Sequence, residues 1–212
     1  MPNPFRRLLP IILACALPLA VAHAADPATP PFEEGKDYVR LSTPVPTDTP
    51  GKIEVIEMFW YGCPHCFDLE PSVREWLKHK PDNVAFVRIP VAFGANWEPG
   101  ARAYYAAEAL GVLDRIHQPL FDAIHQEKRK LSNEDELAVF FAEHGVDQDA
   151  FRKAYSSFQT ETQLRRGNQL AQRYGVRGVP AVIVNGKYDV RSPRMFEVVD
   201  FLIVQEAAAP GG

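Results

Sequence analysis

The chain has 212 residues, of which 46% are hydrophobic and 24% are charged, and it contains 3 cysteines. This composition excludes a disordered chain, a collagen-like repeat and a disulfide-dense miniature scaffold, and the length is sufficient to bury a sizeable core. The formal net charge of −4 gives no electrostatic reason to expect nucleic acid as a partner.

The first 24 residues have the three parts of a secretory signal peptide. Arg6 and Arg7 precede an apolar stretch over residues 8–21, and residues 22–24 (Ala-His-Ala) provide small side chains before a cleavage site. The apolar stretch is too short to form a membrane-spanning helix. We therefore predict cleavage after residue 24 and export of the remaining chain, with an uncleaved N-terminal anchor as the alternative.

The segment after the signal begins with a proline-rich lead-in, and its pattern then predicts strands and a helix. Residues 36–41 fit a short edge strand, and the β-branched and aromatic run over 53–61 predicts a buried strand. A helix is expected over 63–80, with a kink at Pro71 because proline removes a backbone donor. A second apolar strand is expected over 83–91.

From residue 95 to about residue 158 the pattern becomes helical. Ser132, followed three residues later by an acid, resembles a capping box at the start of one of these helices. Asp147 is a candidate cap for the next helix. A further helix over 161–174 is expected to end at Gly175, because glycine adopts the left-handed conformation that closes a helix.

The C-terminal part of the chain returns to a strand pattern. Residues 179–184 and 187–190 predict two strands joined by Asn185-Gly186, which is typical of a two-residue hairpin. Residues 192–193 (Ser-Pro) then open a helix that extends to about residue 205.

The order of these elements predicts the fold class. Strands stand on both sides of an all-helical stretch, which is typical of an α/β domain interrupted by an insertion. We expect residues 25–94 and 161–212 to form the two parts of the sheet domain, and residues 95–160 to form the inserted helical domain.

The candidate reactive groups are two cysteines. Cys15 is removed with the predicted signal peptide, so only Cys63 and Cys66 remain. A bridge between them would close too short a loop to add much stability. The pair lies where a buried strand ends and a helix begins, so the helix N-terminus favours a thiolate at Cys63, and His65, if protonated, would add to this. A stabilised thiolate is a good leaving group, so the oxidised pair could donate its disulfide to a substrate dithiol, with Cys66 as the resolving partner.

Three other interpretations of the cysteine pair compete with redox chemistry. A c-type haem site requires histidine directly after the second cysteine, and Phe67 stands there. A zinc site requires four ligands, and the four downstream histidines are scattered and fit surface or packing positions better than a metal site: His79, His117, His125 and His144. A purely structural disulfide stays open as an alternative to redox chemistry, as does metal binding, although we expect neither a metal nor a bound organic cofactor.

Two motifs together resemble a known family. The sequence Cys63-Pro64-His65-Cys66 and the dipeptide Val179-Pro180 resemble the DsbA family of periplasmic disulfide oxidoreductases, within the thioredoxin superfamily. The resemblance extends from EEGKDY at 33–38 to NGKY at 185–188. It implies a thioredoxin fold with an inserted all-helical domain. It also implies that Pro180 follows a cis peptide bond and packs beside the cysteines, whereas proline at the start of a strand is more often trans.

The resemblance assigns expected roles to further residues. Pro64, His65, Val179 and Pro180 are expected to tune the redox properties of the catalytic pair. Glu57, six residues before Cys63, lies where the family has a buried acid near the dithiol, and such an acid could relay a proton to or from Cys66; a solvent-facing strand residue is the alternative.

Arg88 departs from the family pattern, because the best-known member has lysine at this position. Arginine does not give up its proton, so Arg88 can act only as a fixed charge near Glu57. The aromatic residues around the cysteines are expected to lie mostly in the core, with a minority forming an apolar groove for unfolded chains. The groove candidates are Trp60, Phe67 and Phe93.

The combined prediction is a periplasmic thiol:disulfide oxidoreductase that donates the Cys63–Cys66 disulfide to exported proteins with free cysteines. The resemblance implies reoxidation by a DsbB-like, quinone-linked membrane oxidase, and a monomer. A disulfide reductase or isomerase is one alternative, although the short segment before residue 53 leaves little room for an isomerase dimerisation domain. A non-catalytic metal- or peptide-binding module is the other.

Overall fold

The computed structural model describes residues 31–209, so the predicted signal peptide lies outside the described residues. Its centre is a five-stranded sheet with the strand order β1-β5-β4-β2-β3. Strands β2 and β3 are parallel, and the other neighbouring strands are antiparallel. The strands are β1 (Tyr38–Arg40), β2 (Ile53–Phe59), β3 (Val84–Pro90), β4 (Ala181–Val184) and β5 (Tyr188–Val190).

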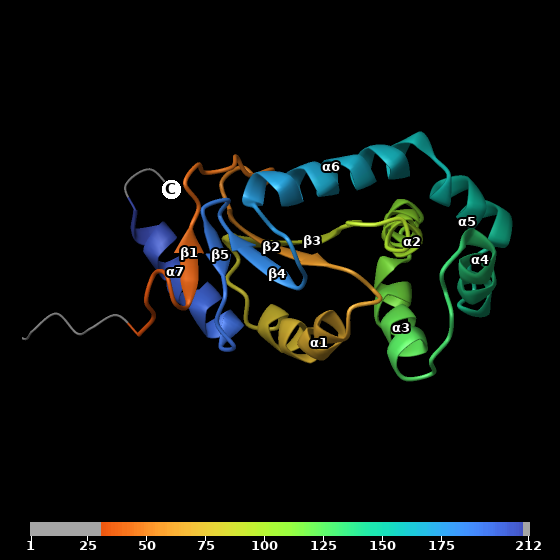
Figure 1. The fold of residues 1–212 in the computed structure, drawn as a ribbon, viewed down its shortest axis with the longest axis horizontal. Coiled ribbons are helices and arrows are strands. Elements are labelled where there is room, and N and C mark those ends of the chain that lie inside the picture. The colour runs from red at the N-terminus through yellow and green to blue at the C-terminus, as the bar shows by residue number, and fades with distance from the viewer. Residues whose placement is uncertain (1–30, 210–212) are drawn as a thin grey trace, which may run out of the picture. The chain divides into compact units, whose positions relative to one another are not determined.

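The described part of the chain has seven helices: α1 (Pro64–Leu77), α2 (Glu98–Ala109), α3 (Leu113–His125), α4 (Glu134–Glu143), α5 (Gln148–Tyr155), α6 (Phe158–Tyr174) and α7 (Met195–Ala208). Helices α1 and α7 cover one face of the sheet, and α6 covers the other (Figure 1). The alternation of side chains along β2 explains this arrangement, because Val55 packs on the α1/α7 side and Ile56 and Met58 pack on the α6 side.

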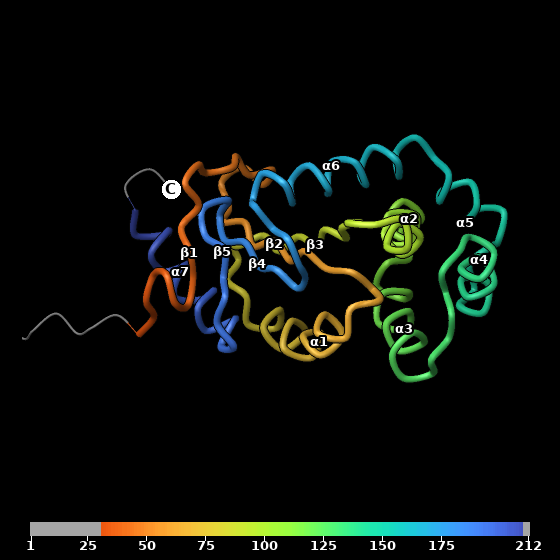
Figure 2. The backbone as a smooth tube through the Cα atoms, viewed as in Figure 1, coloured from red at the N-terminus to blue at the C-terminus, as the bar shows by residue number. Residues whose placement is uncertain are grey.

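Helices α2 to α5, which follow β3 and precede α6 in the chain, form a separate helical block (Figure 2). Their buried side chains share a core with the end of β2, where Phe59 contacts Tyr104 of α2 and Phe121 of α3. This arrangement confirms the predicted α/β fold class with a helical insertion. The predicted domain boundaries themselves stay a prediction, since α6 runs without interruption from the helical block to the sheet.

Several local sequence signals are confirmed. Asn185 and Gly186 have φ values of 50° and 63°, and the Lys187 N–H donates to the Val184 carbonyl at 3.0 Å, as a two-residue hairpin requires. Gly175 ends α6 with φ of 69°. The side chain of Asp147 accepts a hydrogen bond from the backbone N–H of Ala150 at the start of α5.

Some predicted boundaries were wrong by a few residues. The cap of α4 is Asn133, whose side chain accepts from the Glu136 N–H, while Ser132 donates to the Glu136 carboxylate from outside the helix. Helix α6 begins at Phe158, before the predicted position 161, because the hydroxyl of Ser157 caps it. Within residues 31–209, no helix is both long enough and apolar enough to cross a bilayer.

Candidate active site

The two cysteines occupy different environments at the start of α1. Cys63 is the N-cap residue, in extended conformation, and its N–H donates to the Trp60 carbonyl at 3.0 Å. Pro64 begins the helix, where its missing N–H costs nothing. Cys63 keeps 8% of its surface exposed, whereas Cys66, almost one turn further along, has none. Pro64 and His65, between the cysteines, are exposed.

The loop before β4 lies against Cys63. The Val179–Pro180 peptide bond is cis, as the family resemblance implied. The Sγ of Cys63 donates a weak hydrogen bond to the Val179 carbonyl at 3.4 Å. The four residues predicted to tune the pair thus divide into two groups: Pro64 and His65 lie between the cysteines in sequence, whereas Val179 contacts Cys63 in space and is followed by Pro180.

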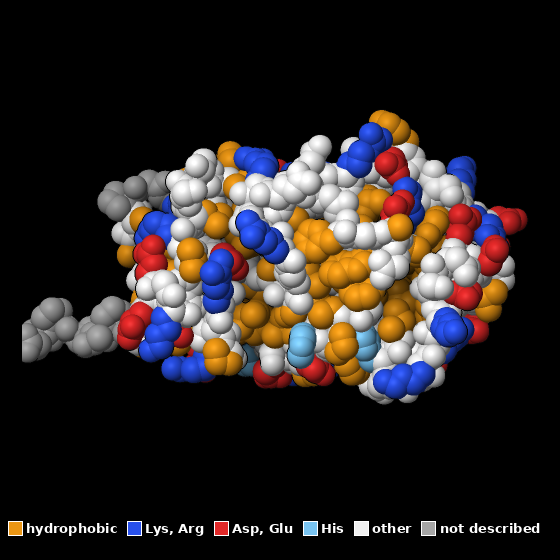
Figure 3. All heavy atoms as spheres, viewed as in Figure 1, with side chains coloured by type: hydrophobic (Ala, Val, Ile, Leu, Met, Phe, Trp, Pro, Cys, Tyr) orange, Lys and Arg blue, Asp and Glu red, His pale blue; other side chains and the backbone are white. Residues whose placement is uncertain are grey.

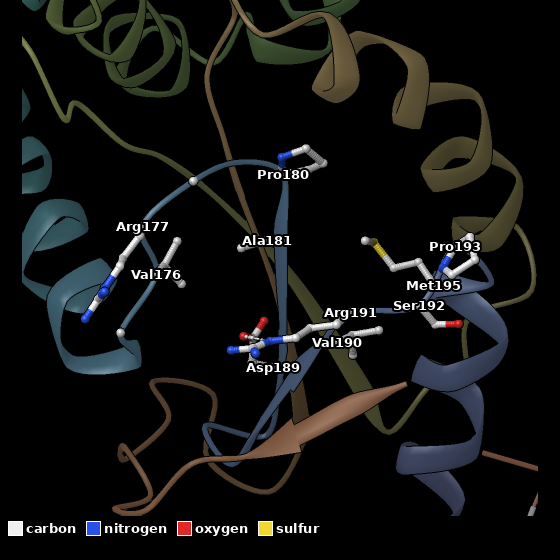
Figure 4. A pocket seen from close by; sticks show the side chains of 12 residues that line it. Val176, Arg177, Pro180, Ala181, Asp189, Val190, Arg191, Ser192, Pro193 and Met195 are labelled. Atoms are coloured by element: carbon white, nitrogen blue, oxygen red, sulfur yellow. Dashed lines mark hydrogen bonds and ion pairs between the residues drawn. The ribbon is translucent and has the colours of Figure 1, made fainter. Parts of the chain in front are cut away.

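A cleft of about 870 Å³ extends from Pro180 along the start of α7. Figure 4 shows Pro180 at one end of the cleft, with Arg177 and Met195 on opposite sides and Asp189 and Arg191 between them. The Arg191 guanidinium donates to the Asp189 carboxylate at 2.9 Å. Because it combines apolar side chains with polar and charged ones, the cleft can hold a segment of polypeptide that approaches Cys63.

Glu57 is fully buried in the middle of β2. Its Oε2 accepts a hydrogen bond from Nε of Arg88 at 3.0 Å, and its Oε1 has no partner among the described residues. Burial raises the pKa of Glu57 to about 7, and the positive charge of Arg88 only partly opposes this. A carboxyl group in this state can take up or release a proton near neutral pH.

The Cys66 thiol is buried like the carboxyl group of Glu57. Burial is the main cause that raises the pKa of the Cys66 thiol, and the nearby Cys63 and Glu57 add to the shift. A thiol of this kind is stable only with its proton, so breaking a bond to Cys66 needs a proton donor close by. The structure therefore brings the predicted relay residue Glu57 into the neighbourhood where a proton would be needed.

Arg88 lies opposite Glu57 in the register of the parallel β2–β3 pair. Its guanidinium also donates to Glu70 of α1, with Nη2 at 3.1 and 3.3 Å from the two carboxylate oxygens. Burial alone would raise the pKa of Glu70, but the hydrogen bond from His117 and the positive charge of Arg88 outweigh it and lower the pKa. One arginine thus joins two buried acids whose pKa values move in opposite directions.

Sequence reasoning missed three residues of this network: Tyr61, Glu70 and His117. The Tyr61 hydroxyl lies 2.8 Å from Nδ1 of His117, and Nε2 of His117 lies 3.0 Å from Oε1 of Glu70. Glu70 could have been found, because it stands four residues after Cys66 and therefore on the same face of α1. The partners of His117 lie 56 and 47 residues away in the sequence, so no local pattern signals them.

The aromatic candidates divide between core and surface. Trp60 stacks on Trp97 with ring centroids 4.2 Å apart and an interplanar angle of 8°, and Phe93, 43% exposed, lies against Trp97 at 5.4 Å. Phe67 is half-buried, while Phe59 and Tyr61 are core residues. Figure 3 shows hydrophobic side chains gathered near the middle of one face of the molecule, with charged side chains mostly around them.

A dithiol at a helix N-terminus beside a cis-proline loop defines the class of thioredoxin-fold oxidoreductases. Residues 54–202 match the model of the DSBA-like thioredoxin domain. The chain is 43% identical to the thiol:disulfide interchange protein DsbA of Azotobacter vinelandii over 209 residues, which cover 95% of this chain and 98% of that protein. It is 42% identical to the Pseudomonas aeruginosa protein of the same name over 208 residues, with coverages of 95% and 97%.

Solved structures agree with these matches. The crystal structure of Pseudomonas aeruginosa DsbA superposes with a TM-score of 0.79 at 42% identity, covering 84% of this chain and 95% of that one. The oxidoreductase DsbA from Xylella fastidiosa gives a TM-score of 0.79 at 36% identity, with coverages of 84% and 99%. The chain belongs to the DsbA family, and it is a protein thiol:disulfide oxidoreductase.

Proposed function

We propose that the chain is a periplasmic oxidase that donates the Cys63–Cys66 disulfide to exported proteins with free cysteines. The observation that carries the exchange chemistry, and that identifies the sulfur under attack, is the asymmetry between the two sulfurs. Cys63 lies at the helix N-terminus within 3.4 Å of the Val179 carbonyl, while Cys66 is fully buried, which raises its pKa. The accessible sulfur is the one that a substrate thiolate attacks.

In the first step, a substrate thiolate attacks Sγ of Cys63. A mixed disulfide forms, the Cys63–Cys66 bond breaks, and the electron pair of that bond leaves on Sγ of Cys66. Because the pKa of Cys66 is raised, this sulfur takes up a proton as it leaves. Glu57, whose pKa is raised to about 7, supplies that proton and takes one back from Cys66 when the pair is reoxidised.

In the second step, another thiolate of the substrate attacks the substrate sulfur of the mixed disulfide. The new substrate disulfide forms, the bond to Cys63 breaks, and Cys63 leaves as a thiolate. The N–H groups at the start of α1 stabilise that thiolate. In total, two electrons pass from the substrate dithiol to the cysteine pair, and no metal or organic cofactor takes part.

Substrate binding is assigned to the surface around Cys63. The cleft beside Pro180 accepts the polypeptide, and Trp60, Phe67 and Phe93 supply apolar contacts. Unfolded chains expose apolar side chains that folded proteins bury, so such a surface favours unfolded substrates.

The cellular setting is also part of the proposal. The predicted signal peptide over residues 1–24 and the membership of the family support a periplasmic location. Each turnover leaves the cysteine pair reduced, so a second protein has to remove two electrons. A DsbB-like, quinone-linked membrane oxidase is the partner that family membership favours, and we expect the protein to act as a monomer.

The test is the redox equilibrium of the Cys63–Cys66 pair in glutathione buffers, read by thiol alkylation and gel shift. A potential well above that of thioredoxin supports the oxidase, and a strongly reducing value favours the reductase or isomerase instead. The C66A variant should accumulate a mixed disulfide on Cys63, because no resolving thiol remains to release it. Absence of any exchange with glutathione would overturn the catalytic assignment.

A further inference from the structure

Two histidines of the helical block contact the residue two positions before Cys63. His117 and His125 lie on α3 with Phe121 between them, at the i, i+4 and i+8 spacing that aligns side chains along one helix face. His117 contacts the Tyr61 hydroxyl at 2.8 Å, and His125 contacts the Tyr61 backbone carbonyl at 2.7 Å. The ring of Phe121 packs on the ring of Tyr61 at 4.8 Å.

The hydrogen-bond directions at His117 follow from its partners. The Glu70 carboxylate can only accept, so Nε2 of His117 carries a hydrogen and donates to it at 3.0 Å. In the neutral ring, Nδ1 then accepts from the Tyr61 hydroxyl. Burial lowers the pKa of His117 despite the opposing hydrogen bond with Glu70, which agrees with a neutral ring.

His125 makes a matching pair of contacts. The Tyr61 carbonyl can only accept, so Nε2 of His125 donates to it. The His125 ring also stacks on Phe67 of α1, with centroids 4.9 Å apart and an interplanar angle of 15°. Each histidine therefore joins Tyr61 to α1, His117 through Glu70 and His125 through Phe67.

The segment that these contacts fix is short and leads directly to the reactive sulfur. Strand β2 ends at Phe59 and α1 begins at Pro64, so the residues from Trp60 to Cys63 set the direction in which Sγ of Cys63 points. Tyr61 is the member of this segment that is anchored from the helical block through both its side chain and its backbone.

We propose that His117 and His125 are positioning residues of the exchange reaction, which anchor Tyr61, and through it Cys63, to helix α3. This inference rests on the function proposed above. Thiol–disulfide exchange needs the attacking sulfur in line with the bond that breaks, and an error of about 1 Å in placing reacting groups can cost about a hundredfold in rate. The helical block thereby contributes to the reaction through two residues that touch neither substrate nor sulfur.

Paired substitutions separate the contacts of each histidine. H125F keeps a ring on Phe67 but loses the donor to Tyr61, whereas H125Q keeps a donor in reach of the carbonyl. H117N places an acceptor where Nδ1 stood and keeps the Tyr61 contact, whereas H117Q places a donor where Nε2 stood and keeps only the Glu70 contact. The proposal predicts that the two variants without the Tyr61 contact, H125F and H117Q, are slow.

The measurement is the second-order rate constant of the oxidised full-length protein with an unfolded peptide that carries one cysteine, at a temperature where circular dichroism shows every variant folded. H125F and H117Q should react about tenfold more slowly than the parent protein. H125Q and H117N should recover most of the rate. Loss of stability alone does not produce this pattern, because all the measurements are made on folded protein.

His144 provides the matched control. Its Nδ1 lies 2.8 Å from the Phe140 carbonyl and its ring contacts Phe140 at 4.3 Å, but it belongs to the end of α4. H144F loses a comparable hydrogen bond and should keep the parental exchange rate.

Parental rates in H125F and H117Q would overturn the proposal, and so would an equal slowing in H144F. If H125F does not fold, the comparison of H117Q with H117N decides the question, and equal rates for those two count against the proposal. A parent protein that does not exchange at all refutes the proposed function itself, and this inference with it.

Discussion

Replacing Glu57 by glutamine should stabilise the protein, and the gain should grow with pH. Glu57 is fully buried, and its pKa is raised from an ordinary value of 4.5 to about 7 by burial, against the opposing charge of Arg88. Glutamine has nearly the shape of the protonated acid, and its amide oxygen can still accept from Arg88. E57Q therefore removes the cost of ionising this site and keeps the geometry.

The stabilisation by E57Q increases with pH because the pKa of Glu57 is higher in the folded state than in the unfolded state. An acid whose pKa is higher in the folded state binds more protons there, so its contribution to stability falls as pH rises. Each tenfold change in proton affinity is worth about 1.4 kcal/mol, so the interval from 4.5 to about 7 corresponds to about 3 kcal/mol. The gain in E57Q should vanish near pH 4, reach about 1 kcal/mol at pH 5 and about 3 kcal/mol at pH 8.

Urea unfolding of the parent protein and E57Q between pH 4 and pH 8 measures this difference directly. E70Q is the control with the opposite sign: although burial opposes it, His117 and Arg88 lower the pKa of Glu70, so its charge stabilises the folded state above the unfolded pKa and is lost as pH falls. A gain in E57Q that does not change with pH, or a loss at pH 8, would refute the assignment of Glu57 as a buried acid that holds its proton near neutral pH.

Three further predictions concern backbone and surface. A Cβ at Gly62 would overlap the Trp60 indole, so G62A should displace that ring from Trp97, change the near-ultraviolet circular dichroism and cost about 1–3 kcal/mol in urea unfolding. G186A should cost about 3 kcal/mol in the same assay, because Gly186 has a positive φ and its Cβ would meet the Val45 carbonyl. W97A should slow exchange with an unfolded peptide more than exchange with glutathione, which has no apolar segment to bind; equal slowing would count against an apolar substrate surface.

Much of the fold could be predicted because its signals are local. The run from Ile53 to Phe59 is apolar enough to define the central strand, although the strand ends two residues before the predicted end at Tyr61. Asn185-Gly186 specifies its hairpin through the positive φ values that these residues tolerate. The errors at Ser132 and at the start of α6 have one cause, since neighbouring polar residues compete for the same free N–H groups and tertiary packing selects one of them.

The site could be predicted only in part. The cysteine motif is contiguous, and the cis bond before Pro180 came from the resemblance to a family, not from spacing. The contact between Arg88 and Glu57 depends on the register of β2 and β3, which no short pattern specifies. The sequence alone favours surface or packing positions for His117 and His125. Their hydrogen bonds to Tyr61 join residues far apart in the chain, and no local pattern distinguishes them from other histidines on an amphipathic helix.

The arrangement of charges around Cys66 also restricts where a proton can come from. Arg88 contacts both buried glutamates but keeps its own proton, so it cannot pass one between them. Although burial alone would raise the pKa of Glu70, His117 and Arg88 lower it, and this acid stays ionised near neutral pH. Burial, only partly opposed by Glu70, lowers the pKa of His117, so this ring stays neutral.

Within this network, Glu57 is the group whose protonation changes near neutral pH, and its Oε1 is free of partners among the described residues. Because Arg88 does not release its proton, Glu57 is the group of this network that can exchange a proton with Cys66, and E57Q should slow the release of Cys66 while it stabilises the fold.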